Sequence, residues 1–349
     1  MSPAPSDPAS RELLQDLTGL SVRLGRQPML VQGGGGNTSV KHAGRLWVKA
    51  SGVWLSEAQE AGAFVSLDLD AVRAASARGE PEPAATQFLG PTRARPSIET
   101  PLHALMPHRF VAHVHSVNTL AWVCRVDAER QLTTRLAGLA WAWVPYVRPG
   151  VPLTLAVADR LSARPDVLAL ANHGLVVGGD SAEGCERLLD EVERRVACAT
   201  SPPAHADVER LEKLATSGGW RLPAYLDCHA AALDARACRQ AASGALYPDH
   251  VVFLGERLPV LSPGEELPAL DAAYRSRHGS PPAAVLVEGA GALVAPGSGR
   301  GVDEMLRCLS LVLARVSEDA PLAFLSKEAV GELTGWEAEK FRQQRDRQP

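Results

Sequence analysis

The stretch DVLALANHGLVVGG, residues 166–179, is the feature that most constrains how this chain can fold. It is apolar almost throughout and is interrupted by Asn-His-Gly, a pattern that predicts two buried strands joined by a turn. The next segment, residues 181–200, has apolar side chains at helical spacing behind Ser181, a residue type that caps helix N-termini. This part of the chain is therefore expected to contain two buried strands followed by an amphipathic helix.

The chain before this stretch shows the same mixture of short strands and helices. A helix is expected at residues 10–25, with Ser10 as its N-cap and Gly25 as its stop signal. The other expected elements are a strand at 45–52, a strand running into a helix at 62–75, a short helix at 100–110 and a strand at 110–117.

Paired prolines in TSPPAHAD, residues 200–207, mark the best candidate for a domain boundary. We expect a disordered Pro/Ser/Ala-rich tail at residues 1–9, one domain at 10–200 and a C-terminal α/β extension at 208–340. In the extension, LYPDHVVFLG and AAVLVEGAGALVAPG are expected to form strands, and GVDEMLRCLSLVLARVSE a helix. These elements either form a second α/β unit or pack on the first domain, and both arrangements stay open.

Charge and composition exclude several classes of function. The formal net charge is −4 and the pI is about 6.2, whereas a surface for nucleic acid or anionic lipid favours an excess of Lys and Arg. The six cysteines are scattered without a CxxC pair, which is typical of reduced thiols. Neither a signal-peptide pattern nor an apolar run of membrane-spanning length occurs. We therefore expect a cytoplasmic protein with no nucleic-acid or membrane partner.

The run LVQGGGGNTSVK, residues 30–41, has the glycine content of an anion-binding loop. Its spacing matches neither the phosphate loop of nucleoside triphosphatases nor the GxGxxG dinucleotide fingerprint. What remains is a backbone that can approach a ligand closely, with Asn37, Thr38 and Ser39 as side-chain donors. A hairpin turn that merely tolerates glycine is the alternative.

The sequence His113-Val114-His115 lies in an apolar, strand-like stretch. Residues i and i+2 of a strand share a face, so two imidazoles can converge on one metal ion there. His173 is the best candidate for a third ligand, because the Asn-His-Gly turn interrupts an apolar strand where a site could open. Three histidines would leave a coordination position for substrate oxygens, as a Lewis-acid metal requires.

A carboxylate is needed as well if the chemistry involves proton transfer. Glu99, in RPSIETPLH, lies just before the helix that leads to the histidine pair. Its side chain could act as an acid or base, or it could interact with the helix macrodipole, and both interpretations stay open. On the same helix, His103 and His108 are expected to be packing or helix-end residues.

Four motifs in this order, GGGGNTSVK, LWVKASG, RPSIETPLHALMPHRFVAHVHS and ANHGLVVGGD, resemble the class II aldolase/adducin family. The resemblance is greatest to the aldolase portion of the long bacterial rhamnulose-1-phosphate aldolase/dehydrogenase proteins. It implies a three-layer α/β/α fold around a mainly antiparallel sheet, and a homotetramer with sites between subunits. It also implies a divalent metal, typically zinc, with manganese as another candidate.

The resemblance also implies roles for individual residues, namely those at positions that match the family motifs. Glu99 would bind the vacant metal or act as acid and base, and Tyr146 is the nearest candidate for a proton donor to the leaving alkoxide. The implied metal ligands are His113, His115 and His173, and the implied phosphate-binding residues are Gly36, Asn37, Ser51, Gly52 and Ser97. Ile98 departs from the family pattern, which often has a second serine at that place.

The implied reaction is cleavage of a ketose 1-phosphate to dihydroxyacetone phosphate and an aldehyde. The metal would chelate the carbonyl and hydroxyl oxygens and stabilise the enediolate that forms as the C3–C4 bond breaks. Relatives include a sugar-phosphate epimerase, a dehydratase and pyruvate-type aldolases acting on keto acids, so these reactions are alternatives. A non-catalytic, adducin-like scaffold is a further alternative, against which the complete histidine and glutamate set argues.

Overall fold

The computed structural model describes residues 7–90, 92, 94–200, 204–216 and 218–346. The chain divides into two compact units. The first unit is Met1–Val123 with Asp127–Ala197, and the second is Cys124–Val126 with Cys198–Pro349. Residues 201–203, in the middle of the predicted boundary segment, lie outside the described residues.

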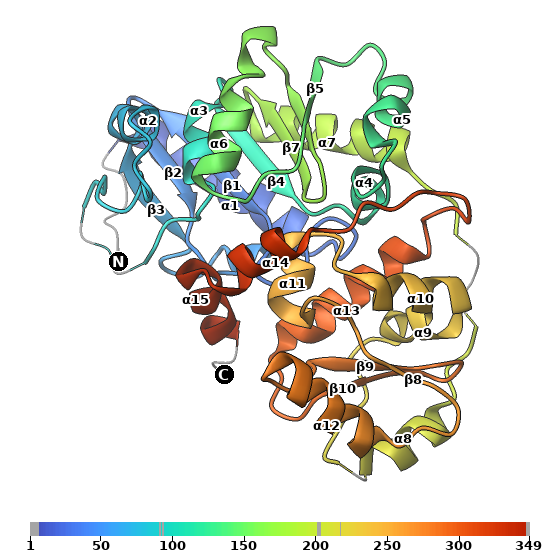
Figure 1. Cartoon of the computed structure of the whole chain (residues 1–349). Helices are drawn as coiled ribbons and strands as arrows, with labels where there is room; N and C mark the ends of the chain where they lie inside the picture. Colours follow the sequence, from blue (N-terminus) through green and yellow to red (C-terminus); the bar gives the residue numbers. More distant parts are fainter. Residues whose placement is uncertain (1–6, 91, 93, 201–203, 217, 347–349) are drawn as a thin grey trace. The chain divides into compact units, whose positions relative to one another are not determined.

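A seven-stranded sheet forms the centre of the first unit (Figure 1), with the order β3-β2-β1-β4-β7-β6-β5. Only the β5/β6 pair is parallel among these neighbours, which confirms the predicted α/β fold with a mainly antiparallel sheet. The strands are β1 Asn37–His42, β2 Arg45–Lys49, β3 Phe64–Asp68, β4 Phe110–Val114, β5 Trp141–Val144, β6 Val167–Leu170 and β7 Gly174–Gly179.

Helices cover both faces of this sheet and make the three layers. On one face, α3 (Thr100–Leu105) packs between α2 (Leu69–Ala77) and α6 (Val151–Ala158), and its Leu102 joins a buried cluster with strand residues such as Val176. On the other face, α1 contacts β1 and α7 contacts β7. The remaining elements of the unit are α1 Pro8–Gly25, α4 Val117–Val123, α5 Ala128–Arg135, α7 Ala182–Val196 and the short 3-10 helices η1 Leu55–Glu57 and η2 Leu161–Ala163.

The caps of two helices test the sequence predictions. Ser181 caps α7 as predicted, since its hydroxyl accepts a hydrogen bond from the backbone N–H of Gly184 at 3.0 Å. The cap predicted for α1 is wrong, because Asp7 rather than Ser10 is the N-cap and its carboxylate accepts from the Ser10 N–H at 2.7 Å. Asp followed by Pro8 starts the helix earlier, since Pro is well suited to the first helical position. The predicted tail therefore includes two helical residues, and residues 1–6 lie outside the described chain.

The second unit combines a small sheet with several helices. Its three strands are ordered β10-β9-β8, with β9/β10 antiparallel and β8/β9 parallel. Eleven of the fourteen residues of the amphipathic helix α13 are buried. The elements are α8 Val208–Thr216, η3 Leu226–His229, α9 Ala230–Leu233, α10 Ala235–Ser243, α11 Pro248–Leu254, β8 Val260–Leu261, α12 Leu267–His278, β9 Ala284–Val287, β10 Gly291–Val294, α13 Arg300–Leu313, α14 Lys327–Thr334 and α15 Glu337–Asp346.

One predicted strand of this unit is a helix. The segment LYPDHVVFLG forms α11, which has Pro248 at its first position and ends at Gly255, whose φ is +90°. All seven residues of α11 are buried, so the apolar run has no polar face from which a helical period could be read. The predicted strands in AAVLVEGAGALVAPG and the helix after them are present as β9, β10 and α13. Across the described chain, none of the helices combines the length and the apolar character needed to cross a membrane.

Candidate metal centre

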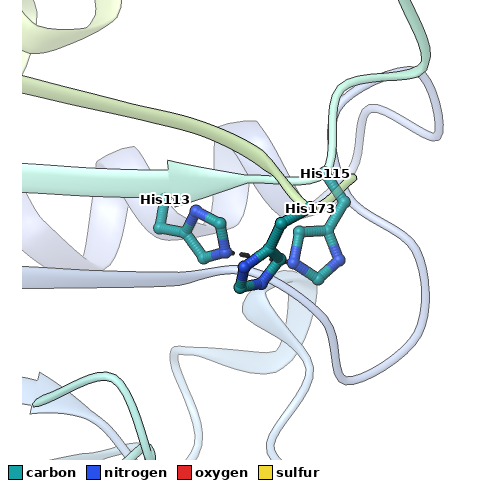
Figure 2. A group of neighbouring side chains, drawn as sticks. All are labelled: His113, His115 and His173. Atoms are coloured by element: carbon teal, nitrogen blue, oxygen red, sulfur yellow. Dashed lines mark hydrogen bonds between the residues drawn. The ribbon is translucent and has the colours of Figure 1, made fainter. Parts of the chain in front are cut away.

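Three histidines of the first unit meet at one end of the central sheet (Figure 2). His113 lies on β4, and His115 lies just beyond the end of that strand. His173 lies in the turn between β6 and β7, and β4 and β7 are paired neighbours in the sheet. Strand pairing therefore brings the third histidine to the pair that the sequence identified.

The ring nitrogens of the three histidines converge on one small volume. One ligand atom from each of His113, His115 and His173 can be chosen so that all three lie within 4.8 Å of one another, and all three residues are buried. The Nε2 atoms of His113 and His115 are 3.0 Å apart. Three imidazoles around one point match the nitrogen donor set of catalytic zinc sites, which keep a further position open. The residues present therefore fit a divalent metal ion.

A backbone carbonyl selects the nitrogen that His113 presents. The Nδ1–H of His113 donates to the carbonyl oxygen of Leu175 at 3.0 Å, which leaves the Nε2 lone pair directed toward the other two rings. Gly174 makes room for this arrangement. A Cβ atom there would lie 2.5 Å from the carbonyl oxygen of Val114 and 3.3 Å from the His113 ring. The Asn-His-Gly sequence of the turn thus needs its glycine as well as its histidine.

Glu99 brings a carboxylate to the three histidines. Its Oε2 lies 3.4 Å from Nε2 of His113, and its Oε1 lies 3.3 Å from Nε2 of His173. Glu99 occupies the N-cap position of α3 but makes no side-chain hydrogen bond to the helix. The sequence left two interpretations of Glu99 open, an acid or base and a partner of the helix macrodipole. The geometry favours the first, because the carboxylate is directed at the histidines.

The electrostatic surroundings keep Glu99 ionised. Burial raises the pKa of its carboxyl, but His113, His173 and a hydrogen bond from Asn37 outweigh burial and lower the pKa to about 2. The Nδ2 of Asn37 donates to Oε2 of Glu99 at 2.7 Å. An ionised, buried carboxylate next to three imidazoles can accept a proton from a bound molecule or share in holding a cation.

The glycine loop and the KASG segment lie against each other beside this centre. The ammonium group of Lys49 donates to the carbonyl oxygens of Gly34 at 2.9 Å and Val53 at 2.6 Å, which ties the two loops together. A Cβ atom on Gly34 would lie 3.8 Å from the Cα of Gly52. Gly36, with φ +61°, needs to be glycine, because a Cβ atom would lie 2.9 Å from the carbonyl oxygen of His113.

A third segment joins these loops by backbone hydrogen bonds. The N–H of Ser51 donates to the carbonyl of Arg95 at 2.8 Å, and the N–H of Ser97 donates to the carbonyl of Lys49 at 3.1 Å. The structure therefore brings together the residues that the resemblance assigned to phosphate: Gly36, Asn37, Ser51, Gly52 and Ser97. Ser97 also accepts a 3.3 Å hydrogen bond from the N–H of Glu99, which connects this wall to the histidine centre.

His103 belongs to the site and was missed from the sequence. It is fully buried, its Nδ1 lies 2.7 Å from Oγ of Ser39, and its Nε2 makes a short hydrogen bond with Oδ1 of Asn37. Burial, assisted by the charge of Lys41, lowers the pKa of His103 to about 3, so the ring is neutral. The sequence pattern that could have identified His103 is its spacing of four residues from Glu99, because residues at this spacing lie on the same side of a helix.

Two further predicted residues lie elsewhere in the first unit. His108 follows α3, and its Nε2 lies 2.8 Å from Oδ1 of Asp166. Tyr146 lies in the segment after β5, the edge strand, which β6 and β7 separate from β4 in the sheet order. Its role as proton donor therefore stays a prediction.

The chain is similar to known proteins over about half of its length. The family described as Class II Aldolase and Adducin N-terminal domain matches residues 15–200. The protein named uncharacterized oxidoreductase YuxG, from Bacillus subtilis (strain 168), is 33% identical over 204 residues, which are 52% of this chain. The chain spans only 29% of the length of that relative.

Two solved structures are also similar. The N-terminal class II aldolase domain of a conserved protein from Thermoplasma acidophilum has 25% identity and a TM-score of 0.48. The aligned residues cover 56% of this chain and 95% of the Thermoplasma chain. YgbL from Klebsiella pneumoniae, a putative aldolase/epimerase/decarboxylase, has 22% identity and a TM-score of 0.40. The aligned residues cover 53% of this chain and 87% of YgbL. The family match extends over more than half of the sequence and includes every residue of the histidine centre. This chain belongs to the class II aldolase and adducin N-terminal domain family.

Proposed function

We propose that this protein is a divalent-metal-dependent aldolase that cleaves a ketose 1-phosphate, similar to rhamnulose or fuculose phosphate, to dihydroxyacetone phosphate and an aldehyde. The observation that carries the proposal is the position of Glu99. Its ionised carboxylate lies within 3.4 Å of Nε2 of both His113 and His173, next to the glycine-loop wall. A structural head domain has no need of such a group.

The three histidines would hold the metal, with zinc or manganese as the candidates. A bound divalent ion would supply Lewis-acid polarisation of the substrate's carbonyl and hydroxyl oxygens. The chain itself orients the ligands, since the Leu175 carbonyl fixes which nitrogen of His113 faces the site. Burial of all three rings keeps bulk water away from the reacting atoms.

Glu99 would move the proton on C3 of the substrate. In the cleavage direction the ionised carboxylate would first take up the proton that the C4 hydroxyl releases as the C3–C4 bond breaks, and then deliver a proton to C3, so that it ends ionised again. In the synthetic direction that carboxylate removes the proton again. The hydrogen bond from Asn37 holds Oε2 in place during this cycle.

The wall formed by the glycine loop, Ser51 and Ser97 would bind the phosphate. Backbone N–H groups of such loops and serine hydroxyls are suitable anion donors. Asn37 uses one amide hydrogen for Glu99, which leaves its second hydrogen for a substrate oxygen. Ile98 replaces a serine found in many relatives, so we expect weaker phosphate binding than in those relatives. Tyr146 from a neighbouring subunit of a homotetramer is the proposed proton donor to the C4 alkoxide, which forms when the reaction runs in the synthetic direction.

A substrate panel tests the proposal. The full chain is loaded with zinc or manganese, and aldehyde release is measured from ketose 1-phosphates, ketose 5-phosphates and 2-keto acids. We expect chelator-sensitive release from a ketose 1-phosphate. Cleavage of keto acids alone would instead identify a pyruvate-type aldolase, and inversion at C4 without cleavage an epimerase. A chain that retains no metal and turns over none of these compounds would favour the scaffold and overturn the proposal.

A further inference from the structure

A continuous chain of hydrogen bonds leads from β1 through α3 to the carboxylate of the metal centre. Ser39 Oγ lies 2.7 Å from Nδ1 of His103, and Nε2 of His103 bonds Oδ1 of Asn37. Nδ2 of Asn37 then donates to Oε2 of Glu99 at 2.7 Å. We call these four residues the Ser39–Glu99 relay. All four are buried, so water does not compete for these bonds.

Regular structure holds the relay at both sides. Asn37 and Ser39 alternate along β1 and therefore point to the same face of the sheet, together with Lys41. Glu99 and His103 are one helical turn apart at α3, which packs on that face. The ammonium group of Lys41 donates to the backbone carbonyl of His103 at 2.7 Å and anchors the helix to the strand. The histidine ring thus bridges two rigid elements.

The direction of every hydrogen bond in the relay follows from its last member. A carboxylate only accepts, so Asn37 must turn its NH₂ group toward Glu99 and its oxygen toward His103. The ring nitrogen that faces this oxygen, Nε2, must then carry the hydrogen. Nδ1 of the neutral ring is left as an acceptor for the hydroxyl hydrogen of Ser39. One tautomer of His103 and one orientation of the Asn37 amide satisfy all the partners.

We propose that His103 is a positioning residue, which in its Nε2–H tautomer fixes the orientation of the Asn37 amide and thereby the place of Glu99 Oε2. The assignment rests on the proposed function where it concerns turnover, because Glu99 acts there. The hydrogen-bond directions are a property of the chain without substrate. Without His103, the Asn37 amide oxygen loses the donor that holds it, and the amide can swing away from the carboxylate. Glu99 would lose its donor and its defined position beside His113 and His173.

Matched substitutions separate positioning from packing. His103→Gln keeps an N–H donor near the Nε2 position, whereas His103→Met fills a similar volume without any donor. We expect kcat to fall roughly 100-fold in His103→Met, because small misplacements of reacting groups have effects of this size. Metal content should stay within about twofold, and His103→Gln should recover most of kcat. His229→Met is the control for removing a buried histidine, and its kcat should not change.

Nuclear magnetic resonance detects the hydrogen bonds of the relay without a measurement of turnover. In the full chain labelled with nitrogen-15, the His103 ring signals are assigned by their absence in His103→Gln. We expect the Nε2–H tautomer for His103 and a side-chain NH₂ of Asn37 whose donated hydrogen exchanges slowly with solvent. In His103→Met that protection should disappear, and in His103→Gln it should remain. Ser39→Ala should weaken the tautomer preference, because Nδ1 loses its donor.

Several results would overturn the assignment. They are an Nδ1–H tautomer of His103, unchanged Asn37 protection in His103→Met, or an equal loss of kcat in His103→Met and His103→Gln. If the resonance results hold while the wild-type chain turns over no compound of the substrate panel, the proposed function fails and the orientation of Asn37 by His103 stands. The two failures are therefore distinguishable.

Discussion

Both units of this protein bury histidines, but His113 in the metal centre of the first unit uses its ring nitrogens differently from the buried histidines of the second unit. In the second unit, Nδ1 of His229 accepts a hydrogen bond from the N–H of Ala292 at 3.0 Å, and Nδ1 of His250 accepts from the N–H of Leu246 at 3.2 Å. Burial lowers the pKa of both rings, that of His250 to about 3. These neutral rings serve as acceptors that satisfy a buried backbone donor, which is a structural role.

In the first unit, His113 of the metal centre reverses this use. His113 donates from Nδ1 to a carbonyl and directs Nε2 toward His115 and His173. These three residues form a cluster with the spacing of metal ligands, and no other such cluster occurs within the described part of the chain. Burial of an imidazole is therefore not a sign of a metal site. The convergence of several ring nitrogens on one point is the sign.

The largest expected effect is the loss of metal binding when a histidine of the metal centre, rather than one of the second unit, is replaced. An Asn side chain can replace Nδ1 of histidine but not Nε2, so His113→Asn should abolish metal retention while the fold survives. The same substitution at His229 should leave the metal in place. The measurement is metal content after dialysis, with about one divalent ion per chain expected in the wild type. Unchanged metal content in His113→Asn would remove the ligand assignment.

The next effect concerns the carboxylate that only the first unit places beside its histidines. In Glu99→Gln the amide cannot take up a proton, so turnover should fall by about 10²- to 10⁴-fold while the metal stays bound. Steady-state rates on the substrate found by the panel, together with metal content, check this. Glu186→Gln is the control, since Glu186 forms a surface ion pair with Arg23 at 2.7 Å. Wild-type rates in Glu99→Gln would exclude its role in proton transfer.

A smaller effect is expected from Lys41, which lies next to the relay and makes the stability of the protein depend on pH. Burial, and secondarily the charge of Arg73, lowers the pKa of Lys41 from 10.5 to about 7. Between these pH values the unfolded chain binds more protons than the folded chain, so the stability contribution of Lys41 rises with pH. The cost of the buried charge is fully present below about pH 7 and disappears above about pH 10.5.

We therefore expect the free energy of unfolding of the wild type to rise by about 2 kcal/mol relative to Lys41→Met between pH 7 and pH 9. Urea denaturation at several pH values measures this difference. Lys213→Met is the control, because the Lys213 side chain is 74% exposed. A difference that stays constant or falls with pH would contradict the lowered pKa.

The smallest effect is expected in the second unit. His229→Asn keeps an acceptor near the Nδ1 position and should cost less than about 1 kcal/mol of unfolding free energy, whereas His229→Ala should cost about 1–3 kcal/mol because the Ala292 N–H loses its partner. Urea denaturation compares the two variants. Equal losses would mean that ring packing, rather than the hydrogen bond, explains the burial of His229.

Sequence reasoning identified much of the site and of the first unit. The α7 cap, the histidine pair and the strands β2, β3, β4, β6 and β7 followed from local patterns, because the alternation of a strand and the capping of a helix involve neighbouring residues. The strands β1 and β5 were not predicted. Sequence reasoning failed at α11, where burial on all sides hides the period, and at α1, where Asp7 caps in place of Ser10. It also missed His103, since nothing in the local pattern shows that Asn37 and Ser39 face that ring.

The sequence by itself determined that His113 and His115 point to one side, because a strand repeats every two residues. It also determined that the glycine run has no nucleotide-binding spacing. Only the tertiary structure decided that His173 and Glu99 reach the same point, since this depends on β7 pairing with β4 and on α3 packing against the sheet. Such contacts join residues far apart in the chain, and local periodicity carries no information about which distant strands become neighbours.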